Sequence, residues 1–164
     1  MTAQINDRFI YEEKVYDCYA AIFDIYELGL YPVWENTGCW RGYVATFALD
    51  GDKLVLKALD TNNGNKRSKI PAINGVQPEV IKKEGLVDGY ENFRKLRYKG
   101  INLQLDYTGS VIIKGEFIFD RYVHMGFQSP TSYETVIELV FEKGILKSKN
   151  DLSGEMAKRT NETI

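Results

Sequence analysis

The stretch RGYVATFALDGDKLVLKAL, residues 41–59, decides the fold class of this chain. Apolar and aromatic residues alternate with other residues on both sides of Asp50-Gly51, which is the period of a half-buried strand. Asp-Gly between two such runs is the strongest short-range signal of a β-hairpin, because the turn needs positive φ angles that these residues tolerate. The stretch therefore predicts two antiparallel strands joined by a tight turn.

Three further segments predict hairpins of the same kind. Residues 101–119 contain two alternating runs around Thr108-Gly109, and residues 133–149 turn at Glu142-Lys143-Gly144. Residues 8–17, RFIYEEKVYD, have the pattern of a shorter pair. Gly115 interrupts one apolar face and predicts a bulge or the close approach of another backbone. We expect a mainly β fold, an antiparallel, hairpin-rich sheet that is either barrel-like or a sandwich.

Helical signals are fewer and shorter, so we expect one to three short helices. The apolar residues of 19–26 are spaced for one helical face, and Gly29 is suited to end that helix. Residues 151–160 predict a helix capped by Asp151 or Ser153.

A polar segment rich in Asn, Gly and Pro, residues 60–78, predicts a long loop. It is not a domain boundary, because neither side alone has enough strands to close a core. Residues 78–83 predict a helical turn that begins at Pro78. The 164 residues match the length of one domain, so we expect a single globular β-rich domain over 1–164, with 151–164 as a frayed tail.

Composition and charge exclude several classes of protein. The net charge of −2 gives no electrostatic reason to bind nucleic acid or an anionic membrane. The first residues, MTAQINDRFIYEEK, lack the pattern of a secretory signal, and no apolar run approaches the length of a membrane span. Without a secretory context, Cys18 and Cys39 are expected to be free thiols. We expect a soluble, cytoplasmic protein.

Motifs for metals and phosphates are missing. His124 is the only histidine and there are two cysteines, whereas a zinc site needs three or four such ligands at suitable spacing. No glycine-rich phosphate loop and no Gly-x-Ser-x-Gly elbow occurs. We therefore expect neither a metal nor a cofactor. Cys39 with His124 as its base is the one nucleophilic pair the sequence offers, but a small buried cysteine is the more ordinary interpretation.

The stretch CWRGY, residues 39–43, is the first candidate binding site. Trp40 and Tyr43 would flank Arg41, whose planar cation suits an anionic ligand or an acidic protein loop. The structural alternative places Trp40 in the core and pairs Arg41 with an acidic neighbour such as Glu35. A mixed outcome has Trp40 inside while Arg41 and Tyr43 line a cleft.

The second candidate lies in RYVHMGFQSPTSYE, residues 121–134. Pro130 bars a central strand position, so the segment predicts an exposed loop, and such loops often carry binding functions. If this loop meets residues 39–43, then His124, Met125, Phe127 and Tyr133 complete one site. The alternative is that Met125 and Phe127 fold back onto the core.

Basic and aromatic residues interleave in NFRKLRYKG, residues 92–100. This pattern can hold phosphates and stack bases. It is also typical of a charged strand that protects the edge of a sheet. Because the chain as a whole is not basic, the edge strand is favoured.

Residues 38–54 and 122–134 together resemble a family of small bacterial cytosolic proteins that have no assigned activity, with similarity over 36–60 and 120–146. The resemblance implies no catalytic residues. Our first hypothesis is a non-enzymatic protein-binding module, in its specific form a stoichiometric inhibitor of the toxin-immunity type. The alternatives are a β-barrel that binds a small molecule and a cysteine-dependent enzyme that uses Cys39 and His124.

Overall fold

The computed structural model describes residues 3–33, 37–64, 69–81 and 94–162, and within these ranges the fold is mainly β. Ten strands belong to one sheet, accompanied by one α-helix and three short 3₁₀ helices. In chain order the elements are β1 (Asp7–Tyr11), β2 (Lys14–Cys18), η1 (Ile25–Leu28), β3 (Tyr43–Asp50), β4 (Lys53–Asn63), β5 (Glu79–Ile81), β6 (Arg94–Tyr98), β7 (Leu103–Gln104), β8 (Gly109–Phe117), η2 (Phe119–Arg121), η3 (Pro130–Ser132), β9 (Tyr133–Glu142), β10 (Ile145–Asp151) and α1 (Ser153–Glu162).

Three of the four predicted hairpins are confirmed. β3 pairs with β4, β9 with β10, and β1 with β2, all antiparallel. The turn between β3 and β4 consists of Gly51 and Asp52, one residue later than the predicted Asp50-Gly51, and Gly51 has φ 64°. The turn between β1 and β2 consists of Glu12 and Glu13, both with positive φ angles. A tight hairpin turn therefore forms there without a glycine to signal it.

The predicted hairpin over residues 101–119 is wrong. β7 pairs with β4, whereas β8 lies between β2 and β9. The chain between β7 and β8 is instead bonded to the β9–β10 turn, because Gly144 N donates to Tyr107 O and Lys143 N donates to Thr108 Oγ1. Alternation of apolar residues shows that a segment is extended, but it does not specify the partner strand.

The helix predictions have mixed outcomes. α1 is confirmed, and Asp151 Oδ1 accepts from the backbone N of Ser153 at its start. The helix expected over 19–26 is wrong, because only the 3₁₀ turn η1 forms there, although Gly29 ends it at φ 81° as predicted. The helical turn at 78–83 is also wrong: β5 occupies Glu79–Ile81, and 82–83 lie outside the described residues.

Two other segments differ from expectation. The loop predicted over 60–78 begins later, because β4 continues to Asn63. β6 is a strand, as expected of residues 92–100, but it is not at the edge, since it lies between β4 and β5. Leu96 and Tyr98 are fully buried on its inner face. At Gly115 the close neighbour is the ring of Tyr16, 3.0 Å from where a Cβ would lie, and not a backbone.

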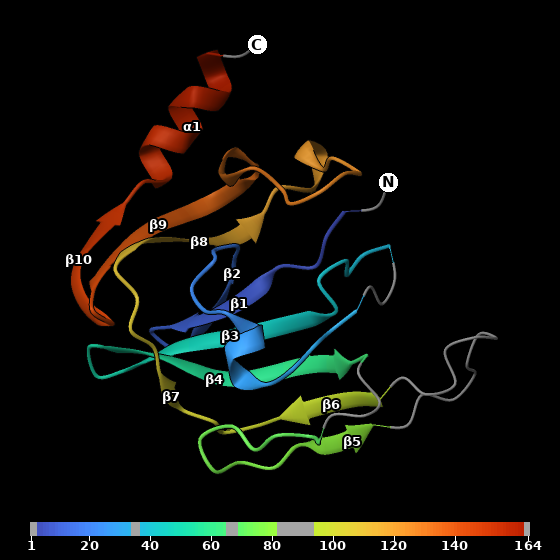
Figure 1. Cartoon of the computed structure of the whole chain (residues 1–164). Helices are drawn as coiled ribbons and strands as arrows, with labels where there is room; N and C mark the ends of the chain where they lie inside the picture. The colour runs from blue at the N-terminus through green and yellow to red at the C-terminus, as the bar shows by residue number, and fades with distance from the viewer. Residues whose placement is uncertain (1–2, 34–36, 65–68, 82–93, 163–164) are drawn as a thin grey trace.

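The strand order is β10-β9-β8-β2-β1-β3-β4-β6-β5, and β10 also pairs with β4 through Ile145 and Lys53 (Figure 1). All pairings are antiparallel except that of β1 with β3. The sheet therefore curls back on itself, which favours the barrel-like alternative over two stacked sheets. Large apolar side chains with at most 1% exposure fill its inner side, among them Phe9, Phe47, Leu59, Leu96, Ile113, Leu139 and Phe141.

Candidate functional site

The two candidate segments, 39–43 and 121–134, meet in space. The guanidinium of Arg41 lies 4.9 Å from the ring centre of Tyr43 and 5.5 Å from that of Phe127. Phe127 in turn stacks on Tyr19, with ring centres 3.9 Å apart. The attraction between the Arg41 cation and the Phe127 ring links the two segments. Phe127 is half-buried between Arg41 and Tyr19.

The N-terminal segment lies between the two candidate segments. Gln4 N donates to Gly126 O at 2.8 Å, while the side-chain oxygen of Gln4 accepts from Trp40 N at 3.0 Å. The Gln4 amide also donates to Thr37 O at 2.7 Å, and Ile5 N donates to Gly38 O. Three backbone segments therefore run side by side at this end of the sheet.

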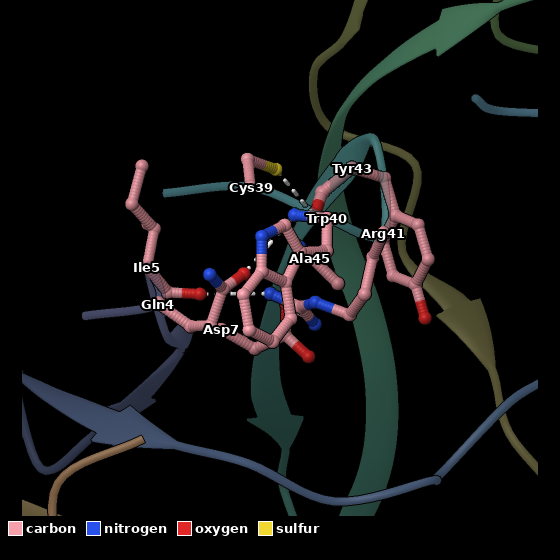
Figure 2. Close-up of polar contacts among 8 residues, drawn as sticks. All are labelled: Gln4, Ile5, Asp7, Cys39, Trp40, Arg41, Tyr43 and Ala45. Carbon is pink, nitrogen blue, oxygen red and sulfur yellow. Dashed lines mark hydrogen bonds and ion pairs between the residues drawn. The ribbon is translucent and has the colours of Figure 1, made fainter. Parts of the chain in front are cut away.

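A buried ion pair explains the position of Arg41. Arg41 Nη1 lies 2.9 Å from Asp7 Oδ1, and its Nη2 donates to Ile5 O at 2.9 Å (Figure 2). Asp7 is only 2% exposed and also accepts from Ala45 N. Burial raises the pKa of Asp7, and the opposing influence of Arg41 and the Ala45 bond is smaller. The acidic partner of Arg41 is thus Asp7; the suggested Glu35 lies outside the described residues.

The turn at residues 39–42 places Cys39 inside and Trp40 outside. Gly42 has φ 75°, and a Cβ there would collide with Val33 O. Cys39 is buried and its Sγ donates to Tyr43 O at 3.6 Å. Trp40 is 44% exposed, so neither interpretation that placed it in the core holds.

The loop between β8 and β9 is held from within by Gln128. This buried side chain donates to Val123 O at 2.6 Å and accepts from Val123 N at 2.9 Å. Its own carbonyl accepts from Lys114 Nζ at 3.1 Å. These three bonds close residues 123–128 into a small ring and attach it to β8.

Lys114 belongs to a second buried polar group. It is 5% exposed, its Nζ lies 5.0 Å from the Tyr133 ring, and it faces Asp17 across the β2–β8 pairing. The Tyr133 hydroxyl donates to Asp17 Oδ2 at 2.9 Å. Burial lowers the pKa of Lys114, opposed by the charge of Asp17. Tyr133 is likewise buried, so it supports the loop from beneath and is not presented at the surface.

Above this support, the loop exposes several large apolar side chains. Phe119 is 83% exposed, and Tyr122, Val123 and Met125 are each about half exposed. Ile5 and Trp40, from the two neighbouring segments, are also exposed. We name these the apolar loop surface: Ile5, Trp40, Phe119, Tyr122, Val123 and Met125. Figure 1 shows the β8–β9 loop on the same side of the molecule as the N-terminal segment.

Cys39 and His124 occupy different environments. The Cys39 sulfur is buried and bonded to Tyr43 O, whereas His124 is exposed and its Nδ1 shares a hydrogen bond of 2.8 Å with the Tyr122 hydroxyl. Neither of these bonds links the thiol to the imidazole. A cysteine nucleophile needs a base within hydrogen-bond reach.

The polar residues that organise this site were missed from the sequence. Asp7 had a signal: it occupies an inward position of β1 with Phe9 and Tyr11, where a charge requires a buried partner. Lys114 and Gln128 had no such signal, because the face of the strand and the path of the loop depend on the other strands.

Within the ranges that the structure covers, no group of three or more His, Cys, Asp or Glu side chains is placed to hold a metal ion. The helices of the described residues are too short and too polar to cross a lipid bilayer. No family model, curated protein or solved structure matches this chain.

Proposed function

We propose that this protein is a non-enzymatic protein-binding module and that the apolar loop surface is its contact site. The observation that carries the proposal is the contrast between the tips and the base of one loop. Its tips are exposed apolar side chains, whereas its backbone is held by the buried side chains of Gln128 and Lys114.

Such an arrangement favours binding for two physical reasons. Aromatic and methionine side chains supply most of the binding energy in the core of protein interfaces. A loop that is already held in one conformation loses little entropy when a partner docks. The Gln128 bonds to Val123 and the Phe127–Tyr19 stack provide this pre-organisation without occupying the exposed side chains.

In its specific form the module is a stoichiometric inhibitor of the toxin-immunity type that acts in the bacterial cytoplasm. The bacterial source is part of this proposal, and it rests on the resemblance of residues 36–60 and 120–146 to small bacterial proteins. Cys18 and Cys39 are both buried and are not joined to each other by a disulfide, which agrees with a reducing compartment.

The two alternative functions have less support. A barrel that binds a ligand needs interior space, and Phe9, Phe47 and Phe141 fill the inner side of this sheet. A cysteine-dependent enzyme needs its base beside the thiol, but His124 is bonded to Tyr122.

The test is an affinity capture from the native lysate with wild-type protein and two surface variants. The double variant Phe119→Ser with Met125→Ser removes two exposed tips. Val80→Ser is the matched control, because Val80 is also exposed but lies on β5 at the far edge of the sheet. Each variant should melt within a few degrees of wild type.

We expect one protein captured at a one-to-one ratio by wild type and by Val80→Ser, with affinity reduced roughly thirtyfold in the double variant, as for a loss of about 2 kcal/mol at a hot spot. The captured protein should lose its own activity when titrated to equivalence. Equal capture by all three proteins, or no stoichiometric protein at all, would contradict the proposal.

A further inference from the structure

A cavity of about 150 Å³ opens on the outer face of the sheet, where β1, β3, β4 and β6 run side by side. The strand register decides which side chains reach it. Val44 lies opposite Asp60, and Asp60 lies opposite Arg97. Their neighbours Ala45, Leu59 and Leu96 are fully buried on the inner face, as the two-residue period of a strand requires.

The charged wall of the cavity consists of Arg8, Lys95 and Asp60. Arg97 Nε lies 3.0 Å from Asp60 Oδ1, so the acidic member already has a cation of its own. Arg8 is exposed, and its guanidinium has no hydrogen bond or ion pair with any residue that the structure describes. Arg8 therefore gives the cavity a positive charge without an ion-pair partner among the described residues, on a chain whose net charge is −2, and this charge attracts an anion.

The volume and the lining residues of the cavity limit which anions can bind there. A cavity of this volume suits a group of a few heavy atoms. Ile5 and Val44 provide an apolar wall for a short carbon chain. The Arg8 fork matches the two oxygens of a carboxylate. A single unpaired guanidinium balances one negative charge, so the cavity favours a carboxylate over a doubly charged group such as phosphate.

We propose that this cavity binds a carboxylate carried on a short aliphatic chain. Two sources share this chemistry: a free small carboxylic acid, and a Glu or Asp side chain of a protein. The inference does not depend on the proposed protein contact. Ile5 belongs to both the cavity lining and the apolar loop surface, whereas Arg8, Val44, Asp60 and Lys95 lie on strands outside that surface.

The test follows backbone amide signals of the ¹⁵N-labelled full chain during titration with sodium butyrate at constant ionic strength. We expect saturable shifts at Val44 and Asp60 and a dissociation constant in the millimolar range. Arg8→Gln should weaken binding at least tenfold. Lys99→Gln is the control and should bind as wild type does, because Lys99 lies beyond the end of β6 and pairs with Glu79.

A second titration distinguishes the sources with the capped tripeptide acetyl-Ala-Glu-Ala-amide. Binding at least tenfold tighter than butyrate assigns the cavity to a protein side chain, and weaker or equal binding assigns it to a free acid. Shifts that do not saturate, or that persist in Arg8→Gln, would overturn the proposal. Inorganic phosphate binding more tightly than butyrate would overturn the carboxylate assignment.

Discussion

Replacing Arg41 by Met removes a buried ion pair while keeping most of the side-chain volume. The substitution deletes the 2.9 Å contact with Asp7 and the bond to Ile5 O. Asp7 is 98% covered in the wild type, and of its polar contacts the bond from Ala45 N remains in the variant. The carboxyl of Asp7 must then stay charged without a cation or take up a proton.

Proton uptake by Asp7 sets the size of the loss of stability. Protonating a carboxyl with the ordinary pKa of 3.8 at pH 7 crosses 3.2 pH units, and at about 1.4 kcal/mol per unit this costs about 4 kcal/mol. Leaving a buried charge unpaired typically costs 3–5 kcal/mol, roughly the same amount. We therefore expect Arg41→Met to lower the free energy of unfolding by about 3–4 kcal/mol at pH 7.

The pH dependence has a definite sign. In the variant the folded state keeps a proton on Asp7 that the unfolded state releases above pH 3.8. The stability of the variant therefore falls as pH rises above this value. The stability of the wild type also falls as pH rises between 3.8 and the raised pKa of Asp7. Because Arg41 opposes this rise of the pKa, the pH range of the fall is narrower than in the variant. At pH 4.5 the protonation cost shrinks to about 1 kcal/mol.

Urea unfolding followed by circular dichroism at pH 4.5 and pH 7 measures both quantities. The double variant Arg41→Met with Asp7→Asn should lose less stability at pH 7 than Arg41→Met alone, because no charge is left unpaired. Arg8→Met is the control for removal of a nearby exposed arginine, with an expected change below about 0.5 kcal/mol. A loss below about 1 kcal/mol for Arg41→Met at pH 7, independent of pH, would refute the argument and leave Arg41 free to contact a partner.

Three further predictions concern the turn and the loop. Gly42→Ala should destabilise the protein by about 2 kcal/mol or more in urea unfolding, because its new Cβ would collide with Val33 O. Gly51→Ala, also at positive φ but with open space around it, should cost about 1 kcal/mol, and equal losses would contradict the steric argument. Gln128→Ala should cost about 1–3 kcal/mol and speed hydrogen exchange at the Val123 amide, and unchanged exchange would show that the clamp is dispensable. Burial lowers the pKa of Lys114, so the wild type should gain stability relative to Lys114→Met as pH rises from that lowered pKa towards 10.5. A difference in the free energy of unfolding between the two proteins that does not change with pH would contradict the burial effect.

Local patterns predicted three of the hairpins, but not β5, where a helical turn was expected. Alternation through residues 43–58 and the Asp50-Gly51 pair were enough for the β3–β4 hairpin, because side-chain period and turn φ angles depend on adjacent residues alone. The same reasoning failed at Thr108-Gly109, where β8 pairs with β2 and β9. Which strand pairs with which is decided by the packing of the whole sheet.

The candidate site shows the same division. The sequence by itself determined that CWRGY contains a cation between aromatics, that the segment around Pro130 connects two strands, and that the chain folds into a hairpin-rich β sheet. The loop predicted over 121–134 is shorter than expected, because β9 begins at Tyr133. Tertiary structure alone decided that the two segments meet, that Asp7 neutralises Arg41, and that Lys114 and Gln128 hold the loop beneath its exposed tips. The physical reason is that a buried charge or amide needs a partner in space, and these partners lie far apart along the chain.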